Sequence, residues 1–231
     1  MISPGALLPL ALLGAVIGLD VVSFPHAMIS RPIVAATITG AFVGSAGRGL
    51  LIGAVLELFA LEMLAVGASR YPEWGPAAVV GATLFASAIL PSPDAGALVL
   101  STAAALLTGW AGGWSMYLHR QINGLMARRS TPSLERGSPR TVTGLQVAGL
   151  SVDLLRGALL TTTALSILTP LATILARRWT LTPDESRAAL LALAAAVAGS
   201  ATWRLFHGFD HARRWFVSGL VLGLLCILLL R

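Results

Sequence analysis

Five ionisable side chains lie close together in an otherwise apolar part of the chain. They are Asp20, His26, Arg31, Glu57 and Glu62. Such a group at membrane depth costs about 2.5–3.5 kcal/mol on insertion scales, and the rare examples mark pathways for substrates or ions. The cluster therefore predicts a substrate pathway, provided that the surrounding sequence crosses a membrane.

The amino-acid composition indicates that the surrounding sequence does cross a membrane. The chain has 231 residues, of which 56% are hydrophobic and 11% are charged, and its mean hydropathy is +0.81. A soluble domain carries about 25% charged residues. A chain with so little charge cannot cover a water-facing surface, which indicates an integral membrane protein. The net charge of +6 does not suggest nucleic acid, because the arginines lie in loops between apolar spans, where they set topology.

Eight apolar segments are long enough to be helices in a bilayer. They fall near residues 5–22, 32–46, 49–67, 75–91, 96–118, 143–176, 187–203 and 214–230. The second and third are short and glycine-rich, a pattern typical of broken or re-entrant helices that line a protected cavity. The same glycines also fit close helix packing, and the two interpretations are compatible. We expect an all-α, polytopic transmembrane bundle with broken or re-entrant helices in its N-terminal half.

The hydrophilic stretch 119–142 divides the chain. It carries five arginines and one glutamate, which predicts a basic, cytoplasmic loop. Residues 1–118 are then an N-terminal transmembrane region with the substrate site, and residues 143–231 are a C-terminal transmembrane region. The front of 143–176, with Gln146, Asp153 and Arg156, is interpreted as an amphipathic segment at the interface. Thr182, Pro183, Asp184 and Glu185 predict a helix start.

The chemistry of soluble enzymes is not visible in this sequence. There is no glycine loop with a lysine that could cradle a nucleotide, and the histidines lack the helical zinc spacing with a partner glutamate. The aromatic residues near span ends are typical of a membrane-interface belt, and one or two of them could instead stack on a sugar. We therefore expect a protein that is not an enzyme, with no metal and no cofactor.

An ordered set of motifs across residues 31–72 resembles a known family. Arg31–Pro32 is followed by Gly40 and Gly44, by Gly49–Gly53 with Leu56–Glu57, by Gly67–Ala68 and by Pro72. This order is similar to that of the C component of the mannose/sorbose-type sugar phosphotransferase permeases. The likeness is strong over about 60 residues and extends to the C-terminal third only in hydropathy.

The resemblance implies a membrane channel subunit in the bacterial inner membrane. It implies a D-type membrane partner, soluble A and B phosphocarrier proteins and an oligomeric complex. A hexose or amino sugar is bound in the membrane and phosphorylated by the B protein, and no nucleic acid takes part. The family often has glycine where this chain has Glu62. A degenerate paralogue that senses or regulates without transport is the alternative.

Asp20 and Glu57 are the first candidates for sugar ligands. A carboxylate accepts hydrogen bonds from two adjacent hydroxyls, each about twice as strong as a neutral bond. Glu57 could equally be a structural partner of Arg31 or Arg48, because a buried charge needs a counter-ion. Asp20 could simply end the first helix.

The remaining candidates are expected to have supporting roles or are less strongly indicated as substrate ligands. His26 could donate to a sugar hydroxyl or be a packing group. Arg31, immediately before Pro32, is expected at a helix start, where it could pair with Glu57 or Asp20 or hold backbone carbonyls. Glu62 lies about 140° around a helix from Glu57, which favours a structural or interfacial role. Structural roles are also expected for two glycines of the motif, Gly53 and Gly67.

Overall fold

The computed structural model describes residues 4–21, 23, 25–61, 70–87, 95–178 and 181–229, and this part of the chain is helical throughout its regular structure. The helices are α1 (Pro4–Leu19), α2 (Pro32–Phe42), α3 (Ala46–Ala60), α4 (Trp74–Ala86), α5 (Ala95–Arg129), α6 (Thr131–Glu135), α7 (Pro139–Arg178), α8 (Pro183–Phe206) and α9 (Ala212–Leu229). Each of the eight predicted apolar segments overlaps one of these helices. The all-α bundle expected from the sequence is confirmed.

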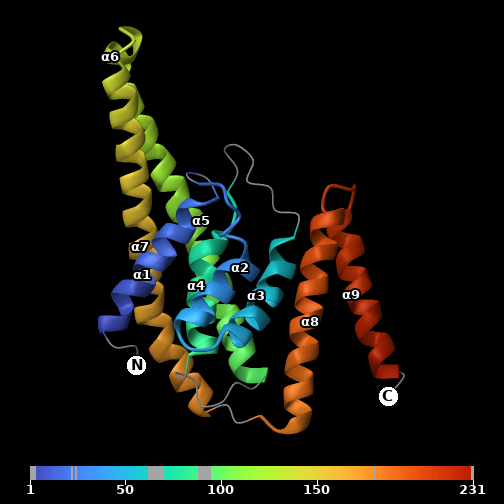
Figure 1. Cartoon of the computed structure of the whole chain (residues 1–231). Coiled ribbons are helices and arrows are strands. Elements are labelled where there is room, and N and C mark those ends of the chain that lie inside the picture. Colours follow the sequence, from blue (N-terminus) through green and yellow to red (C-terminus); the bar gives the residue numbers. More distant parts are fainter. Residues whose placement is uncertain are drawn as a thin grey trace.

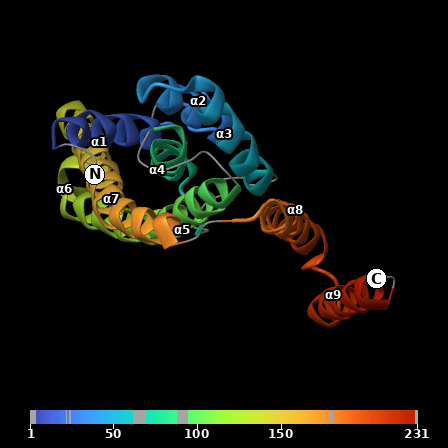
Figure 2. The same cartoon turned by 90° about the horizontal axis from the view of Figure 1, so that it is seen from below.

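Helix α4 is the centre of the bundle. All thirteen of its residues are buried, and α1, α2, α3, α5 and α7 pack around it. Figure 2 shows these helices enclosing α4, with α8 and α9 set to one side. We call α1–α5 and α7 the inner bundle, and α8 with α9 the outer pair. No described side chain of the outer pair is buried.

The three helices at the heart of the inner bundle are too short to cross a bilayer. At 1.5 Å per residue, α2, α3 and α4 span about 16, 22 and 20 Å, against about 30 Å of hydrocarbon. Such short pieces are tolerated at membrane depth where protein surrounds them. This matches the broken or re-entrant helices predicted for the N-terminal half.

Glycines bring α2 and α3 into direct contact. A Cβ placed on Gly49 would lie 2.3 Å from the carbonyl oxygen of Ala36, and one on Gly40 would lie 2.6 Å from the Cα of Gly49. A Cβ on Gly53 would meet the Cα of Ile33 at 2.9 Å. The close-packing interpretation of these glycines is therefore also correct, and the contact at Gly53 supports the structural role that stays a prediction for it.

Two long helices form a hairpin that rises above the rest of the chain (Figure 1). Helix α5 has 35 residues and α7 has 40, and both, with α8, are apolar and long enough to cross a membrane. The hydrophilic stretch 119–142 is the end of this hairpin. It consists of the last turns of α5, the short helix α6 and the first turn of α7, so the expectation of a loop is wrong over most of its length. The turn itself includes Gly137, whose φ of 69° suits glycine.

The front of segment 143–176 was interpreted as an interfacial helix, and that interpretation is wrong. It is part of the continuous helix α7, which packs on α1, α4 and α5, and its Asp153 is buried. Asp153 and Arg156 point into the protein because they meet partners there, whereas Gln146 is exposed.

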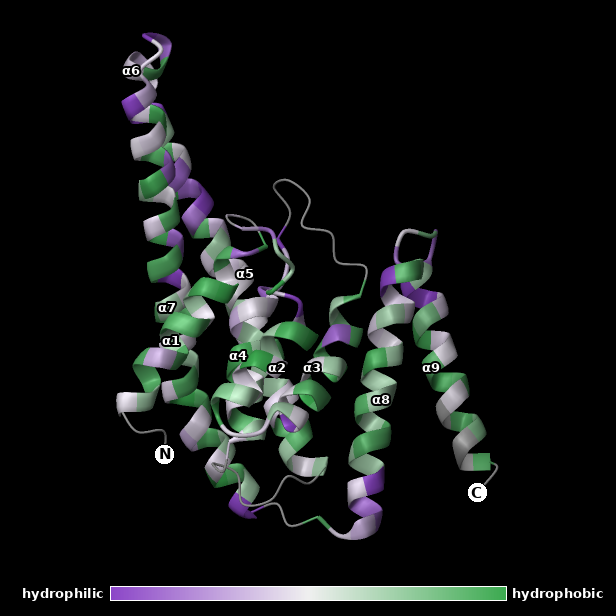
Figure 3. Cartoon of the chain, in the orientation of Figure 1, coloured by the Kyte–Doolittle hydropathy of each residue, from purple (hydrophilic) through white to green (hydrophobic). Residues whose placement is uncertain are grey.

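The helix start at residues 182–185 is confirmed. Thr182 is the N-cap of α8, its hydroxyl accepts from the Glu185 backbone N–H, and the Glu185 carboxylate accepts from the Thr182 backbone N–H. This reciprocal arrangement is a capping box. The capping box lies wholly within residues 182–185, and Figure 3 shows α8 with polar ends and an apolar middle.

Candidate functional site

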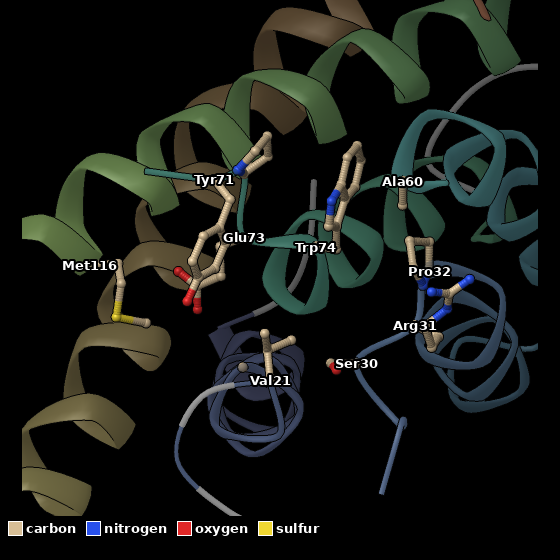
Figure 4. A pocket seen from close by; sticks show the side chains of 11 residues that line it. Val21, Ser30, Arg31, Pro32, Ala60, Tyr71, Glu73, Trp74 and Met116 are labelled. Atoms are coloured by element: carbon tan, nitrogen blue, oxygen red, sulfur yellow. The ribbon is translucent and has the colours of Figure 1, made fainter. Parts of the chain in front are cut away.

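A small cavity lies where the short helices meet. Its volume is about 130 Å³, and it is bounded by residues before α2, at the end of α3, before and at the start of α4, and on α5 (Figure 4). The lining residues are Gly18, Val21, Ser30, Arg31, Pro32, Ala60, Tyr71, Pro72, Glu73, Trp74 and Met116. It therefore brings a carboxylate, a guanidinium, a hydroxyl and two aromatic rings together inside an apolar bundle.

The segment before α4 is held against α5 by glycines. The Glu73 backbone N–H donates to the Gly109 carbonyl oxygen at 2.9 Å. A Cβ on Gly112 would lie 2.6 Å from the Cβ of Glu73, and one on Gly113 would lie 2.5 Å from the carbonyl oxygen of Tyr71. The glycines of α5 thus create the space in which residues 71–73 run, and this directs Glu73 into the bundle.

Arg156 of α7 binds two buried carboxylates. Its guanidinium makes two hydrogen bonds to the carboxylate of Glu73 and two to Asp153, the latter at 2.9 and 2.7 Å. It also donates to the Ser115 hydroxyl at 2.8 Å, and the Ser23 hydroxyl donates to Asp153. The side chains of Arg156, Glu73 and Asp153 are 10%, 3% and 1% exposed. We call these three residues with Ser23 and Ser115 the Arg156 cluster.

The Arg156 cluster joins four parts of the fold. The Arg156 guanidinium binds the start of α4, the middle of α5 and Asp153 of α7, and Asp153 in turn accepts from the loop after α1. Breaking a buried pair by removing one partner costs about 3–5 kcal/mol, because the other charge is left without compensation. One wall of the cavity, at Glu73, is therefore fixed by bonds rather than by apolar packing alone.

Asp20 organises the loop that leads from α1 to α2. Its carboxylate accepts from the backbone N–H groups of Ala27 and Ser30 and from the Ser30 hydroxyl, the last two at 3.0 and 2.8 Å. Two residues of this loop, His26 and Met28, have φ values of 61° and 60°, which non-glycine residues seldom adopt. Asp20 is 1% exposed, and it stabilises this conformation from the inside.

Glu57 of α3 holds the start of α2. It forms an ion pair with Arg31, which precedes the helix, and it accepts from the Ile33 backbone N–H at 3.1 Å. A carboxylate at a helix N-terminus is stabilised by the free N–H groups and by the helix dipole. Arg31 remains 45% exposed while Glu57 is 14% exposed. The structural pair with Arg31 that the sequence left open is present.

The predicted ligands do not line the cavity, whereas two of the predicted supporting residues do. Arg31 and Pro32 are in its wall. Asp20 and Glu57 lie behind the wall and each bonds a residue in it, namely Ser30 and Arg31. His26 is exposed on the loop. Glu62 and Gly67 lie outside the described residues. A direct contact of Asp20, His26 or Glu57 with a substrate stays a prediction.

Sequence reasoning missed Glu73 and Ser115 and misplaced the acid and base of α7. One signal was available. Asp153 and Arg156 are three residues apart within an apolar stretch, the spacing of neighbours on one helix face. An intramembrane acid and base with this spacing indicate a buried pair, and a buried arginine can bind a second carboxylate. Nothing in the spacing showed that this second carboxylate is Glu73.

The family comparison decides what kind of protein this is. Residues 6–177 match the family model described as the sorbose-specific IIC component of the phosphotransferase system. The chain belongs to this IIC family. The resemblance seen in the ordered motifs is thereby confirmed, and the matched range contains the inner bundle, the cavity and the Arg156 cluster.

Relatives and solved structures are similar to this IIC chain in different degrees. The sorbose-specific EIIC component of Klebsiella pneumoniae is 30% identical over 129 residues, which cover 56% of this chain and 46% of that protein. The match thus spans less than half the length of this curated relative.

Two solved structures share the fold at 18% identity. One is described as a membrane protein, with a TM-score of 0.71 over 96% of this chain and 87% of the other. The second is the mannose transporter ManYZ in complex with microcin E492, with a TM-score of 0.60 over 96% of this chain and 88% of the other.

Proposed function

We propose that this protein is the membrane channel subunit of a phosphoenolpyruvate-dependent sugar phosphotransferase system of the mannose/sorbose type. It binds and translocates a hexose or amino sugar, and a partner B protein phosphorylates that sugar. It works in the bacterial inner membrane with a D-type membrane subunit and with soluble A and B phosphocarrier proteins, and it transfers no phosphoryl group itself.

The observation that carries this proposal is the cavity among the short helices. Its polar groups fit a ligand with many hydroxyls: Arg31 donates, the Ser30 hydroxyl, whose proton goes to Asp20, accepts, and Glu73 accepts. Each Glu73 carboxylate oxygen accepts one hydrogen bond from Arg156, and a carboxylate as a whole can accept about four hydrogen bonds. Glu73 can therefore bind Arg156 and a substrate hydroxyl at once.

The size and the aromatic residues of the cavity favour a small ligand with an apolar face. Pockets for drug-sized ligands measure about 300–1,000 Å³, more than the 130 Å³ here. The rings of Tyr71 and Trp74 supply flat apolar surface beside the polar groups, as suits a sugar ring. The burial of Trp74 in this wall supports the alternative role of a stacking residue over a place in the interface belt.

Sugar binding by the purified complex tests the proposal. The tagged chain is isolated from its native membranes, its partners are identified, and a panel of hexoses and amino sugars is titrated by calorimetry. We expect a D-type subunit to co-purify and one sugar to bind. Arg31→Gln removes a charged donor worth about 1.5–3 kcal/mol, so the Kd should rise by about tenfold or more.

Arg48→Gln is the matched control, because Arg48 lies on the same pair of helices but outside the cavity wall. Its Kd should equal that of the unmodified chain. Equal loss of binding in both variants would place the sugar elsewhere. A complex that assembles with the D-type subunit but binds no sugar would support the sensing or regulatory alternative instead.

A further inference from the structure

The end of the α5–α7 hairpin projects well beyond any membrane that the inner bundle could occupy. The two helices are about 52 and 60 Å long at 1.5 Å per residue. The hydrocarbon core is about 30 Å thick, and the bilayer with its headgroups is about 40–45 Å thick. The deeply buried part of α5 runs from Gly96 to His119. The turns after it, with α6 and the start of α7, therefore stand in water.

This projecting end carries a concentrated positive charge. Residues 119–142 contain Arg120, Arg128, Arg129, Arg136 and Arg140, with Glu135 as the one acid. Arg128, Arg129, Arg136 and Arg140 are exposed, and no ion pair found among the described residues includes any of them. These four arginines thus have no acidic partner within the described part of the chain.

The turn between α8 and α9 lies at the same end of the molecule and adds Arg204, Arg213 and Arg214 (Figure 1). At the opposite end, Arg177 and Arg178 close α7, and the start of α8 contributes Asp184 and Glu185 as well as Arg187. The excess of arginine at the hairpin end places that end in the cytoplasm under the positive-inside rule.

Apolar side chains lie among the exposed arginines of the hairpin. One shallow groove of about 490 Å³ on α5 has Leu125 beside Arg128. Another, of about 640 Å³ on α7, has Val147 beside Arg140. Leu125 and Val147 are 54% and 57% exposed. Exposed apolar residues rimmed by charge are the composition of a protein-binding surface.

We propose that the basic end of this hairpin is the docking surface for an acidic face of a soluble cytoplasmic protein. Lipid headgroups do not reach this basic end, because the hairpin is long enough to extend beyond the headgroup region. A second copy of this chain would bring like charges together, which is unfavourable. The apolar residues within the patch favour a protein over a bare polyphosphate. Under the proposed function, on which this identity of the partner rests, the docked protein is the B phosphocarrier.

A matched pair of variants separates the two ends of the molecule. Arg128 and Arg129 form the last turn of α5, and Arg177 and Arg178 form the last turn of α7 at the opposite end. Each pair is exposed, so Gln at both positions should preserve folding. The full chain is placed in nanodiscs of phosphatidylcholine, and binding of the purified B protein is followed by biolayer interferometry. Sugar binding is measured on the same samples.

We expect R128Q/R129Q to slow association with the B protein by about tenfold and R177Q/R178Q to leave it unchanged, because charge complementarity acts mainly on the association rate. Raising the salt concentration should weaken binding to the unmodified chain and have less effect on R128Q/R129Q. Sugar binding should be equal in all three proteins.

Equal B-protein binding by the two double variants overturns the docking surface while leaving the proposed function intact. Absence of B-protein binding by a chain that still binds sugar does the same. Loss of both sugar binding and D-type partner from the unmodified chain is the separate result that rejects the proposed function. If the B protein bound only to nanodiscs that contain phosphatidylglycerol, the arginines would be assigned to lipid, and this result would also overturn the proposal.

Discussion

The inner bundle and the outer pair are built on different principles. In the inner bundle α4 is wholly buried, glycine backbones touch, and three charged side chains are bonded to one another out of water. In the outer pair no described side chain is buried. Its contacts are few, among them a ring contact between Trp203 and Phe216 and a hydrogen bond from Arg204 to the Leu61 carbonyl oxygen.

This difference shows which parts of the fold depend on long-range contacts. A helix of the outer pair is specified by its own residues, such as the capping box of α8, and its apolar surface is left for lipid or for other proteins. The position of a helix in the inner bundle is specified by residues of other helices. Substitutions in the two regions should therefore differ in how much they change stability and in how far through the structure that change extends.

The largest effect is expected when Arg156 is replaced by Leu. Glu73 and Asp153 would remain buried without a cation, which should lower the stability of the inner bundle by about 3–5 kcal/mol. The melting temperature in detergent should fall accordingly. Arg187→Leu, in the outer pair, is the control: its partner Asp184 is 94% exposed, so the loss should be below about 1 kcal/mol. Similar losses in both variants would remove the distinction between the two regions.

An intermediate effect is expected from adding one methyl group at a helix contact. Gly49→Ala puts a Cβ 2.3 Å from the Ala36 carbonyl oxygen and forces α2 and α3 apart, at a cost of about 1–3 kcal/mol. Gly47→Ala, two residues earlier in the same helix, has nothing within 4 Å of the new Cβ and should be neutral or stabilising by up to about 1 kcal/mol. Chemical unfolding of both variants measures whether the two changes in stability have opposite signs. Changes of the same sign would contradict this account.

A smaller and local effect is expected at the cap of the outer pair. Thr182→Ala removes the acceptor for the Glu185 N–H, which should cost about 1 kcal/mol. Hydrogen exchange should become faster in the first turn of α8 and stay unchanged in α4. Faster exchange in both helices would mean that the outer pair supports the inner bundle after all.

The smallest effect on stability is expected at the half-exposed pair between α2 and α3. Arg31 is 45% exposed, so Arg31→Gln should change stability by no more than about 1 kcal/mol. The same variant should lose about tenfold or more in sugar affinity, as set out above. A large loss of stability with unchanged affinity would make Arg31 a structural residue alone.

The residues of the site show how far prediction from sequence reached. The ionisable residues of 20–62 were rightly singled out as unusual for a membrane segment, and the Arg31–Glu57 pair was among the alternatives. Asp20 was predicted as a sugar ligand or as the end of the first helix, and its role in the loop was not predicted, because its three donors are in the loop that it folds. Glu73 was not singled out, because its importance comes from Arg156, 83 residues later.

The sequence by itself determined the class, the helix segments and several helix ends. These depend on local quantities: hydropathy over about 20 residues, the spacing of glycines, and a cap within four residues. It also determined the family, through motifs in a fixed order. The tertiary structure alone decided that 119–142 is a helical hairpin end, that Asp153 points inward, and that Glu73, Arg31 and Trp74 share one cavity. Those facts depend on which helices meet. A hydropathy pattern determines how long a helix is, but it does not determine which charged residue of a neighbouring helix it will contact.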